Sequence, residues 1–303
     1  MAASRRVAVE VGGRRLELSN LDKVLYPAAS FTKAAAIDYV TRIGPAILPH
    51  LAGRPLTMKR YPDGVEGKFF YEKQAPGHRP DWVTTTTVRT TRRGRDIDFV
   101  VVGELATLVW ATNLASLELH TSLSRAADMP TPTLVAFDLD PGEPATIVEC
   151  CRVALLLRDV FTGLGLQAFP KTSGSKGMQV YVPLNSPVTY KETAGFARTL
   201  AELLAREHPG LVVSNMRRDL RAGKVLVDWS QNSESKTTVS VYSLRARERP
   251  TGSTPLRWEE VEAAAAGGDP AALVFEAADV RARVDDHGDI FAPVLTLEQR
   301  LPG

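Results

Sequence analysis

The chain has 303 residues, 44% of them hydrophobic and 24% charged, a composition typical of a soluble globular protein with one large domain or two ordinary ones. Its 37 Lys and Arg against 35 Asp and Glu leave a formal net charge of only +2, so any nucleic-acid site has to come from local clusters of charge. The only two cysteines, Cys150 and Cys151, are adjacent, which argues against a disulfide framework and a zinc site. The sequence shows no signal segment and no long apolar run, which argues against secretion and a membrane partner and favours the cytoplasm.

Short strand and helix patterns alternate through the amino-terminal part. VAVEVGGRRLELSN (7–20) predicts a hairpin that turns at Gly12-Gly13. The apolar spacing from Thr32 to Leu51 predicts a helix with Thr32 as its N-cap and an interruption near Gly44-Pro45. Further strands are expected at 55–62, 82–90, 97–103 and 117–123, and a helix at 104–115.

The elements from residue 133 to residue 244 follow the order of a split βαβ palm. A strand at 133–140 leads into a helical pattern over 145–164, and 166–184 has the pattern of a strand, a loop and a strand. A helix over 189–209 carries a capping box of Thr189 and Glu192, and strands are expected at 225–231 and 237–244. This β-α-β-β-α-β order is that of ferredoxin-like folds. The tail from Trp258 is acidic and Ala-rich, with one more helix.

Two acids stand one residue apart in the apolar strand VAFDLDPG (135–142). Asp138 and Asp140 project from the same side of a strand, where their charges repel each other. Two Mg²⁺ or Mn²⁺ ions about 3.5–4 Å apart would relieve that repulsion and support phosphoryl transfer. Asp228, at the end of the apolar strand in VLVDWSQN, is a candidate third ligand if the two strands are neighbours. The alternative is structural: a solvated turn at Pro141-Gly142, and Asp228 as a turn former.

The loop KTSGSKGMQ (171–179) lies between the two acid-bearing strands in sequence. Its glycines, the Ser173 hydroxyl and the Lys176 ammonium suit a phosphate, although the loop is not a Walker A motif and could be a plain hairpin turn. Lys236, Arg245 and Arg247, on the final strand, could add positive charge for the same triphosphate.

Taken together, FDLDPG (137–142), SGSKGMQ (173–179) and VDWSQNSESKTTVSVYSLR (227–245) resemble the three motifs of the archaeo-eukaryotic primase superfamily. Within it the chain is similar to the polymerase domain of bacterial ligase D, which also occurs as a stand-alone primase-polymerase. The resemblance runs from LSNLDKVLYP (18–27), through KFFYEKQAPGHRPDWV (68–83) and LELH (117–120), to YSLRARERP (242–250), nearly the whole chain.

The resemblance implies roles for individual residues. It implies that Asp138, Asp140 and Asp228 are catalytic and bind the metals. It also implies that the nucleotide is bound by six residues: His120, Ser173, Lys176, Gln179, Lys236 and Arg245. DNA binding falls to Lys23 and Lys33, which match a pocket for a 5′-phosphate, and to Phe69 and Phe70, which match a pair that stacks on template bases. Arg92, Arg93 and Arg95 form a basic turn that is a further DNA-contact candidate.

Residue 179 departs from the family pattern, whose motif S-G-x-x-G-x-H ends in histidine, and this puts its nucleotide-contacting role in doubt. Each of the other carried-over roles also has a structural alternative. Lys23 and Lys33 could be surface charges, Phe69 and Phe70 could be core residues, and His120 could be a hydrogen-bonded structural histidine.

The resemblance implies an α+β, primase-like fold in which an RRM-like or ferredoxin-like palm packs on an N-terminal α/β module. One domain is expected over 1–303, with the module at about 7–125, the palm at about 126–255 and a helical tail at about 256–303. Ligase and phosphoesterase domains are not expected in a chain of this length.

The implied function is that of a DNA-dependent DNA/RNA polymerase, a nucleotidyltransferase that extends 3′-OH ends at gaps or double-strand breaks. Two Mn²⁺ or Mg²⁺ ions and an NTP or dNTP are the implied cofactors and substrates, with a preference for NTPs. DNA with a 5′-phosphorylated gap or end, Ku and a separate ligase are the implied partners, in non-homologous end joining at the nucleoid. Two alternatives stay open: a metal-dependent phosphodiesterase, and a catalytically weak homologue that binds DNA ends.

Overall fold

The computed structural model describes residues 6–89 and 94–302, so Arg92 and Arg93 of the predicted basic turn lie outside the described residues. The chain forms two compact units, and each is assembled from three separate stretches of sequence. Unit 1 comprises residues 1–122, 239–252 and 276–288, and unit 2 comprises residues 123–238, 253–275 and 289–303. Within the described residues, no helix is both long enough and apolar enough to cross a membrane.

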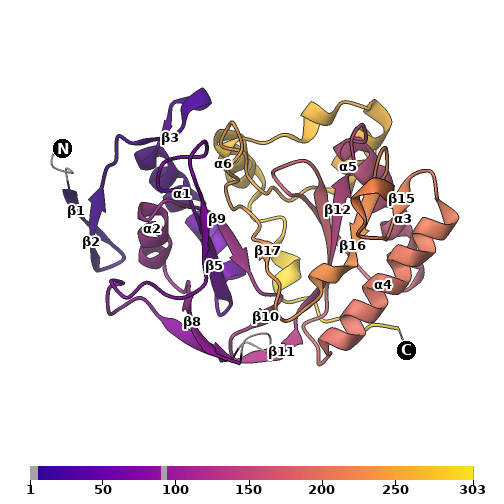
Figure 1. The fold of residues 1–303 in the computed structure, drawn as a ribbon, viewed down its shortest axis with the longest axis horizontal. Coiled ribbons are helices and arrows are strands. Elements are labelled where there is room, and N and C mark those ends of the chain that lie inside the picture. Colours follow the sequence, from indigo (N-terminus) through magenta and orange to yellow (C-terminus); the bar gives the residue numbers. More distant parts are fainter. Residues whose placement is uncertain (1–5, 90–93, 303) are drawn as a thin grey trace. The chain divides into compact units, whose positions relative to one another are not determined.

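Unit 1 is built around a sheet with the strand order β17-β9-β5-β8-β7, in which β6 also pairs with β5 (Figure 1). The strands of this sheet are β5 (Pro55–Arg60), β6 (Phe70–Glu72), β7 (Thr85–Arg89), β8 (Asp96–Val101), β9 (Ser116–Thr121) and the short β17 (Thr238–Val239). The helices of the unit are α1 (Lys33–Leu51), α2 (Leu105–Asn113) and α6 (Ala277–His287). Two small hairpins precede α1: β1 (Arg6–Val11) with β2 (Arg14–Ser19), and β3 (Val24–Tyr26) with β4 (Phe31–Thr32).

The first two predicted elements are present, with one correction in α1. The hairpin turns at Gly12 and Gly13, whose φ angles of +56° and +77° are accessible to glycine at little cost. Thr32 caps α1, because its side chain accepts a hydrogen bond from the backbone N–H of Ala35 at 3.2 Å.

The predicted interruption near Gly44-Pro45 is wrong, since α1 is continuous from Lys33 to Leu51. The buried stripe of the helix, which includes Ile43 and Ile47, runs past Pro45 without a break. The proline removes only one helical hydrogen bond, and packing of the stripe outweighs that loss. Gly44 serves that packing, because a Cβ at this position would lie 2.9 Å from Cδ1 of Leu105 in α2.

Unit 2 carries the predicted split βαβ palm. Its sheet has the order β13-β14-β12-β16-β15; the first four strands pair with one another in antiparallel fashion, and β15 is parallel to β16. These strands are β12 (Leu134–Pro141), β13 (Phe169–Thr172), β14 (Met178–Pro183), β15 (Val212–Val213) and β16 (Val225–Asp228). The helices are α3 (Ile147–Gly163), α4 (Tyr190–Glu207) and α5 (Trp258–Gly267), and a small hairpin joins β10 (Ser124–Arg125) to β11 (Asp128–Pro132).

One face of the palm sheet is sealed by helices. Val135, Phe137 and Leu139 of β12 are fully buried in a core shared with α3 and α4. The predicted capping box of Thr189 and Glu192 begins α4. Because side chains alternate along a strand, Asp138 and Asp140 project from the opposite face of β12.

The last predicted strand, 237–244, is not part of the palm. Within this segment only β17 forms a strand, and it lies beside β9 in the sheet of unit 1; Leu244 forms an isolated bridge with Gly252. Past β17 the backbone N–H of Ser240 donates to the carbonyl of Leu119 at 2.9 Å, and the hydroxyl of Ser243 accepts from the N–H of Leu119 at 2.8 Å. The alternating pattern of this segment therefore reflects a chain that runs along β9 and is partly held by serine side chains.

Candidate functional site

The three predicted catalytic carboxylates share one face of the palm sheet. Asp138 of β12 is directly opposite Asp228 of β16 in the antiparallel register, and Asp140 is opposite Leu226. Paired residues of antiparallel strands project to the same side, as do residues two apart on one strand. The register therefore brings together Asp138, Asp140 and Asp228. Asp138 and Asp140 both belong to β12, which ends at Pro141, and the chain turns after them as the alternative expected.

Asp228 is held by the turn that follows it. Its Oδ1 accepts hydrogen bonds from the backbone N–H and the hydroxyl of Ser230, at 2.9 and 2.6 Å, and its Oδ2 accepts one from Nε2 of Gln231 at 2.7 Å. Nζ of Lys236 donates to the same Ser230 hydroxyl. Asp228 is thus both a turn former and a member of the carboxylate face, and Lys236 is linked to it through a single hydroxyl group.

Asp138 is held from the other side by Gln179 of β14. Gln179 is directly opposite Asp138, and its Nε2 donates to Oδ1 of Asp138 at 3.0 Å. Its Oε1 accepts from Nζ of Lys171 at 2.6 Å and from the hydroxyl of Tyr181 at 3.2 Å. The Lys171 side chain, only 1% exposed, also donates to Oγ of Ser253 at 2.7 Å. Lys171, which the sequence did not single out, therefore orients the amide that contacts Asp138.

The carboxylate face carries negative charge that the protein does not neutralise completely. Burial, and then the charge of Asp140, raise the pKa of Asp138 to about 7, with Asp228 adding to the rise and the hydrogen bond from Gln179 opposing it. Among the described residues, no three His, Cys, Asp or Glu side chains form a preformed metal-binding group. Oxygen donors under mutual repulsion nevertheless fit Mg²⁺ or Mn²⁺, provided that Asp228 exchanges some of its hydrogen bonds for the metal.

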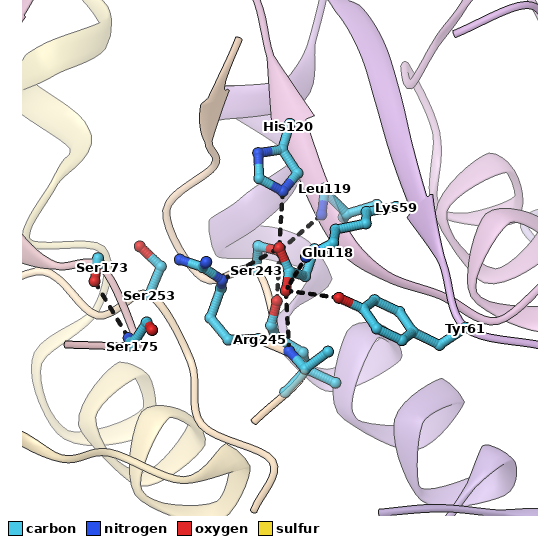
Figure 2. A network of polar contacts seen from close by, with 12 residues as sticks. Lys59, Tyr61, Glu118, Leu119, His120, Ser173, Ser175, Ser243, Arg245 and Ser253 are labelled. Atoms are coloured by element: carbon cyan, nitrogen blue, oxygen red, sulfur yellow. Dashed lines mark hydrogen bonds and ion pairs between the residues drawn. The ribbon is translucent and has the colours of Figure 1, made fainter. Parts of the chain in front are cut away.

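The predicted phosphate-handling loop connects β13 to β14. Ser173 Oγ accepts from the backbone N–H of Ser175 at 3.2 Å (Figure 2), and Lys176 forms an exposed ion pair with Glu143 at 2.8 Å. A Cβ at Gly177 would lie 2.0 Å from the carbonyl oxygen of Leu139, so only glycine allows the loop to pack against β12. The loop is therefore fastened to the strand that carries Asp138 and Asp140.

In unit 1, His120 and Arg245 meet at a buried carboxylate, Glu118 (Figure 2). Glu118 Oε2 lies 2.9 Å from Nε2 of His120 and 3.4 Å from Nε of Arg245. Its Oε1 lies 3.3 Å from both Nζ of Lys59 and the hydroxyl of Tyr61. Glu118 was not among the predicted site residues, although LELH places it two residues before His120 on the same side of a strand.

Exposed aromatic side chains surround Lys59 in the same unit. The exposed fractions of Phe69, Phe70 and Tyr71 are 52%, 44% and 56%, so the core alternative for Phe69 and Phe70 is wrong. Lys59 Nζ lies 4.4 Å from the centroid of the Phe69 ring, and Cζ of Arg60 lies 5.1 Å from that of Phe70. Tyr71, which the sequence analysis did not single out, is as exposed as its two neighbours.

Lys23 and Lys33 are brought together by the backbone, since the N–H of Lys33 donates to the carbonyl of Lys23 at 2.8 Å. Lys33 is only 6% exposed, so it is not a surface charge, and its Nζ donates to the carbonyl of Ser19 at 2.7 Å. Burial, and then the charges of Lys23 and Arg60, lower the pKa of Lys33 to about 8. Lys23 forms an exposed ion pair with Asp63 at 2.9 Å.

Comparison with known proteins decides the family. A family model described as the LigD primase-polymerase domain matches residues 32–291. The chain belongs to the LigD primase-polymerase family. It is 40% identical over 282 residues to the multifunctional non-homologous end joining protein LigD of Mycolicibacterium smegmatis, which covers 92% of the chain and 36% of that protein. It is 30% identical over 249 residues to the bifunctional LigD of Bacillus subtilis, with 82% of the chain and 40% of that protein covered.

A solved structure supports the same assignment. The polymerase domain of Mycobacterium tuberculosis ligase D, in complex with DNA, matches with a TM-score of 0.86 and 39% sequence identity, over 93% of this chain and 98% of that one. The expected α+β, primase-like fold is thereby confirmed. The chain spans little more than a third of the length of the mycobacterial LigD proteins that it matches.

Proposed function

We propose that this chain is a DNA-directed nucleotidyltransferase that extends primer 3′-OH ends at gaps or double-strand breaks during non-homologous end joining. It would transfer a nucleoside monophosphate from an NTP or dNTP and release pyrophosphate. The observation that carries the proposal is the register of β12 and β16, which sets Asp138 opposite Asp228 in a chain of the LigD primase-polymerase family.

Asp138, Asp140 and Asp228 would hold two divalent ions, Mn²⁺ or Mg²⁺. When bound, such ions stabilise the attacking and leaving oxygens of a phosphoryl transfer. The protein contributes the fixed geometry of the ligands, since Gln179 orients Asp138, and Ser230 and Gln231 orient Asp228. Misplacing such ligands by about 1 Å costs a large part of the rate, which is why these partners matter.

The remaining predicted residues divide between the two units. In unit 2, Ser173, Lys176 and Lys236 would bind the triphosphate, while the Gln179 amide already serves Asp138 and Lys171. In unit 1, the nucleotide-binding candidates are His120 and Arg245. The DNA-binding candidates are Lys23 and Lys33 for a 5′-phosphate, and Phe69 and Phe70 for the template bases; exposed rings stack on any base.

Primer extension on a duplex with a 5′-phosphorylated gap tests the proposal, with each nucleotide set and with Mn²⁺ or Mg²⁺ in turn. The expected result is metal-dependent extension that is faster with NTPs and Mn²⁺, and that disappears when Asp138 and Asp140 are both changed to Ala. Release of short fragments without nucleotide would instead identify a phosphodiesterase. Tight binding of DNA ends without turnover would identify the catalytically weak homologue, which the replacement of the family histidine by Gln179 keeps in view.

The names of the matched relatives support a proposal for partner proteins. The matched relatives carry names that place them in end joining, and this chain covers only part of them. We therefore propose Ku as a partner that brings the chain to DNA ends at the nucleoid, and a DNA ligase activity that seals the extended product. Co-purification with Ku on a DNA end, and sealing of the extended product in a mixture with a ligase, would test the two proposals.

A further inference from the structure

The buried carboxylate of Glu118 has no part in the metal chemistry proposed for unit 2. Its side chain is 2% exposed, yet three basic side chains lie within ion-pair distance of it: Lys59, His120 and Arg245. A buried carboxylate is costly unless cations and hydrogen-bond donors compensate it. Two predicted nucleotide-binding residues, His120 and Arg245, lie next to this carboxylate. We therefore ask how the charge of Glu118 affects the protonation and position of these two side chains.

Glu118 remains ionised at neutral pH. Burial alone would raise the pKa of its carboxyl group, but the hydrogen bond from His120 and the charges of Arg245 and Lys59 outweigh burial and hold the pKa well below its ordinary range. An ionised carboxylate can only accept hydrogen bonds. Nε2 of His120, 2.9 Å from Oε2 of Glu118, therefore has to carry a hydrogen atom.

The protonation state of Nδ1, the second ring nitrogen of His120, follows from that of Nε2. Burial lowers the pKa of His120 below its ordinary value, despite the opposing hydrogen bond and charge of Glu118. The charged and titratable groups that face its ring are Glu118 on β9, Lys59 on β5, Tyr71 on β6 and Arg245 in the segment after β17. A neutral imidazole has a proton on only one of its two ring nitrogens, and the hydrogen bond to Glu118 places that proton on Nε2. Nδ1 is then a hydrogen-bond acceptor.

Glu118 also holds the chain segment that carries Arg245. The backbone N–H of Ala246 donates to Oε1 of Glu118 at 3.2 Å, while Nε of Arg245 lies 3.4 Å from Oε2. Ser240 and Ser243 bind the backbone of Leu119, the residue after Glu118. One side chain of β9 thus fixes the backbone beside Arg245 and the guanidinium itself, as well as the ring of His120.

We propose that Glu118 is a positioning residue for the incoming nucleotide, which holds the Arg245 guanidinium in place and fixes the His120 ring with Nδ1 as the nitrogen that can meet a ligand. The inference rests on the proposed function, because it takes Arg245 and His120 to be nucleotide-binding residues. It adds to that function a buried carboxylate that belongs to neither the proposed metal site nor the proposed DNA-binding residues.

The tautomer of His120 can be measured without nucleotide, metal or DNA. The ¹⁵N shifts of the imidazole nitrogens in the full chain at pH 7.5 distinguish the forms, and the chain has only five histidines, so a His120→Asn variant assigns the signal. The expected result is a neutral ring protonated at Nε2, with a mixture of forms in Glu118→Gln. A wild-type ring protonated at Nδ1, or at both nitrogens, would overturn the proposal even if Glu118→Gln does not fold.

Kinetics test the link to the nucleotide. For Glu118→Gln we expect the nucleotide KM to rise by about tenfold or more, the range expected for loss of hydrogen bonds to a charged group, with little change in the KM for DNA ends. Glu118→Asp should recover part of the loss. Glu104→Gln, which breaks an exposed ion pair with Arg14 in the same unit, is the control and should stay within about twofold of the wild type.

Two outcomes separate this inference from the proposed function. An active wild type together with a folded Glu118→Gln variant of unchanged nucleotide KM would overturn the inference alone. A wild type that does not extend primers would overturn the proposed function. In that case the His120 tautomer and the affinity for a fluorescent ATP analogue, compared between wild type and Glu118→Gln, would still decide whether Glu118 positions a nucleotide site.

Discussion

Asp138 and Asp228 are opposite each other across the β12–β16 pair, and each is held by its own polar neighbours: Gln179 on one side, Ser230 and Gln231 on the other. We expect Asp228→Asn to lower kcat for primer extension by at least about 100-fold, because the proposed mechanism makes Asp228 a metal ligand, and such ligands contribute several kcal/mol to transition-state stabilisation. Binding of DNA ends, followed by fluorescence anisotropy, should change little. Glu202→Gln, an exposed carboxylate change on α4, is the control; an equal loss of kcat in that variant would contradict the prediction.

Replacing Gln179 tests the chain of hydrogen bonds that runs from Lys171 through Gln179 to Asp138. In Gln179→Leu the buried ammonium of Lys171 loses one acceptor and Asp138 loses one donor. We expect a loss of about 1–3 kcal/mol in the free energy of unfolding, since buried polar groups left unpaired are costly. The midpoint of thermal unfolding should fall by several degrees, measured by calorimetry. Gln167→Leu, a change of an exposed side chain, is the control and should leave Tm nearly unchanged. An unchanged Tm in Gln179→Leu would show that this chain of hydrogen bonds contributes little to stability.

The lowered pKa of Lys33 predicts a pH dependence for recognition of a 5′-phosphate. With a pKa of about 8, Lys33 is protonated below pH 8 and neutral above it, and a bound phosphate dianion favours the protonated form. Affinity for a 5′-phosphorylated end should be level between pH 7 and 8 and then fall, by up to about tenfold per pH unit. Anisotropy with 5′-phosphate and 5′-hydroxyl duplexes from pH 7 to 9.5 measures the effect.

The matched control for this prediction is Lys33→Arg, because arginine stays charged throughout that range. Its phosphate-dependent binding should not fall above pH 8. If the wild type and Lys33→Arg decline together, the decline belongs to another group. If the preference for a 5′-phosphate is absent at every pH, Lys33 does not form the expected pocket.

The exposed rings predict a loss of DNA affinity without a loss of stability. Changing Phe70 or Tyr71 to Ala should weaken binding to a gapped duplex by roughly 5- to 150-fold, the equivalent of about 1–3 kcal/mol for one stacked base. Tm should hardly change, because these side chains are 44% and 56% exposed. Val274→Ala, which truncates another exposed apolar side chain, should leave binding unchanged. Stability losses larger than binding losses would assign the rings to packing.

Local patterns in the sequence were enough to predict most of the palm. The alternation in β12, the capping box of α4 and the order of the elements together specify a split βαβ sheet, and that order makes β12 and β16 neighbours. The face shared by Asp138, Asp140 and Asp228 follows from this topology. These features depend on residues close together in sequence, where propensity and periodicity are informative.

The errors and omissions depend on contacts that are distant in sequence. The continuity of α1 through Pro45 rests on packing against α2, where Gly44 meets Leu105. The segment after β17 is held to Leu119 of β9 through the backbone of Ser240 and the hydroxyl of Ser243, although its own alternation suggested a palm strand. Lys171 and Glu118 were not identified as site residues because Ser253, the partner of Lys171, and Lys59 and Arg245, partners of Glu118, become neighbours only after folding. The only local signal for Glu118 was its position two residues before His120.

Each unit is built from three separate stretches of sequence, and this limits how the chain can be cut or recombined. The chain leaves unit 1 after residue 122, returns to it for 239–252 and again for 276–288, and the remaining stretches build unit 2. A single cut, such as one near residue 125 or 255, therefore releases neither unit intact. Recombination between relatives would have to exchange three matching stretches at once to replace one unit. The unit that carries Asp138, Asp140 and Asp228 and the unit that carries Glu118 are therefore expected to be inherited together.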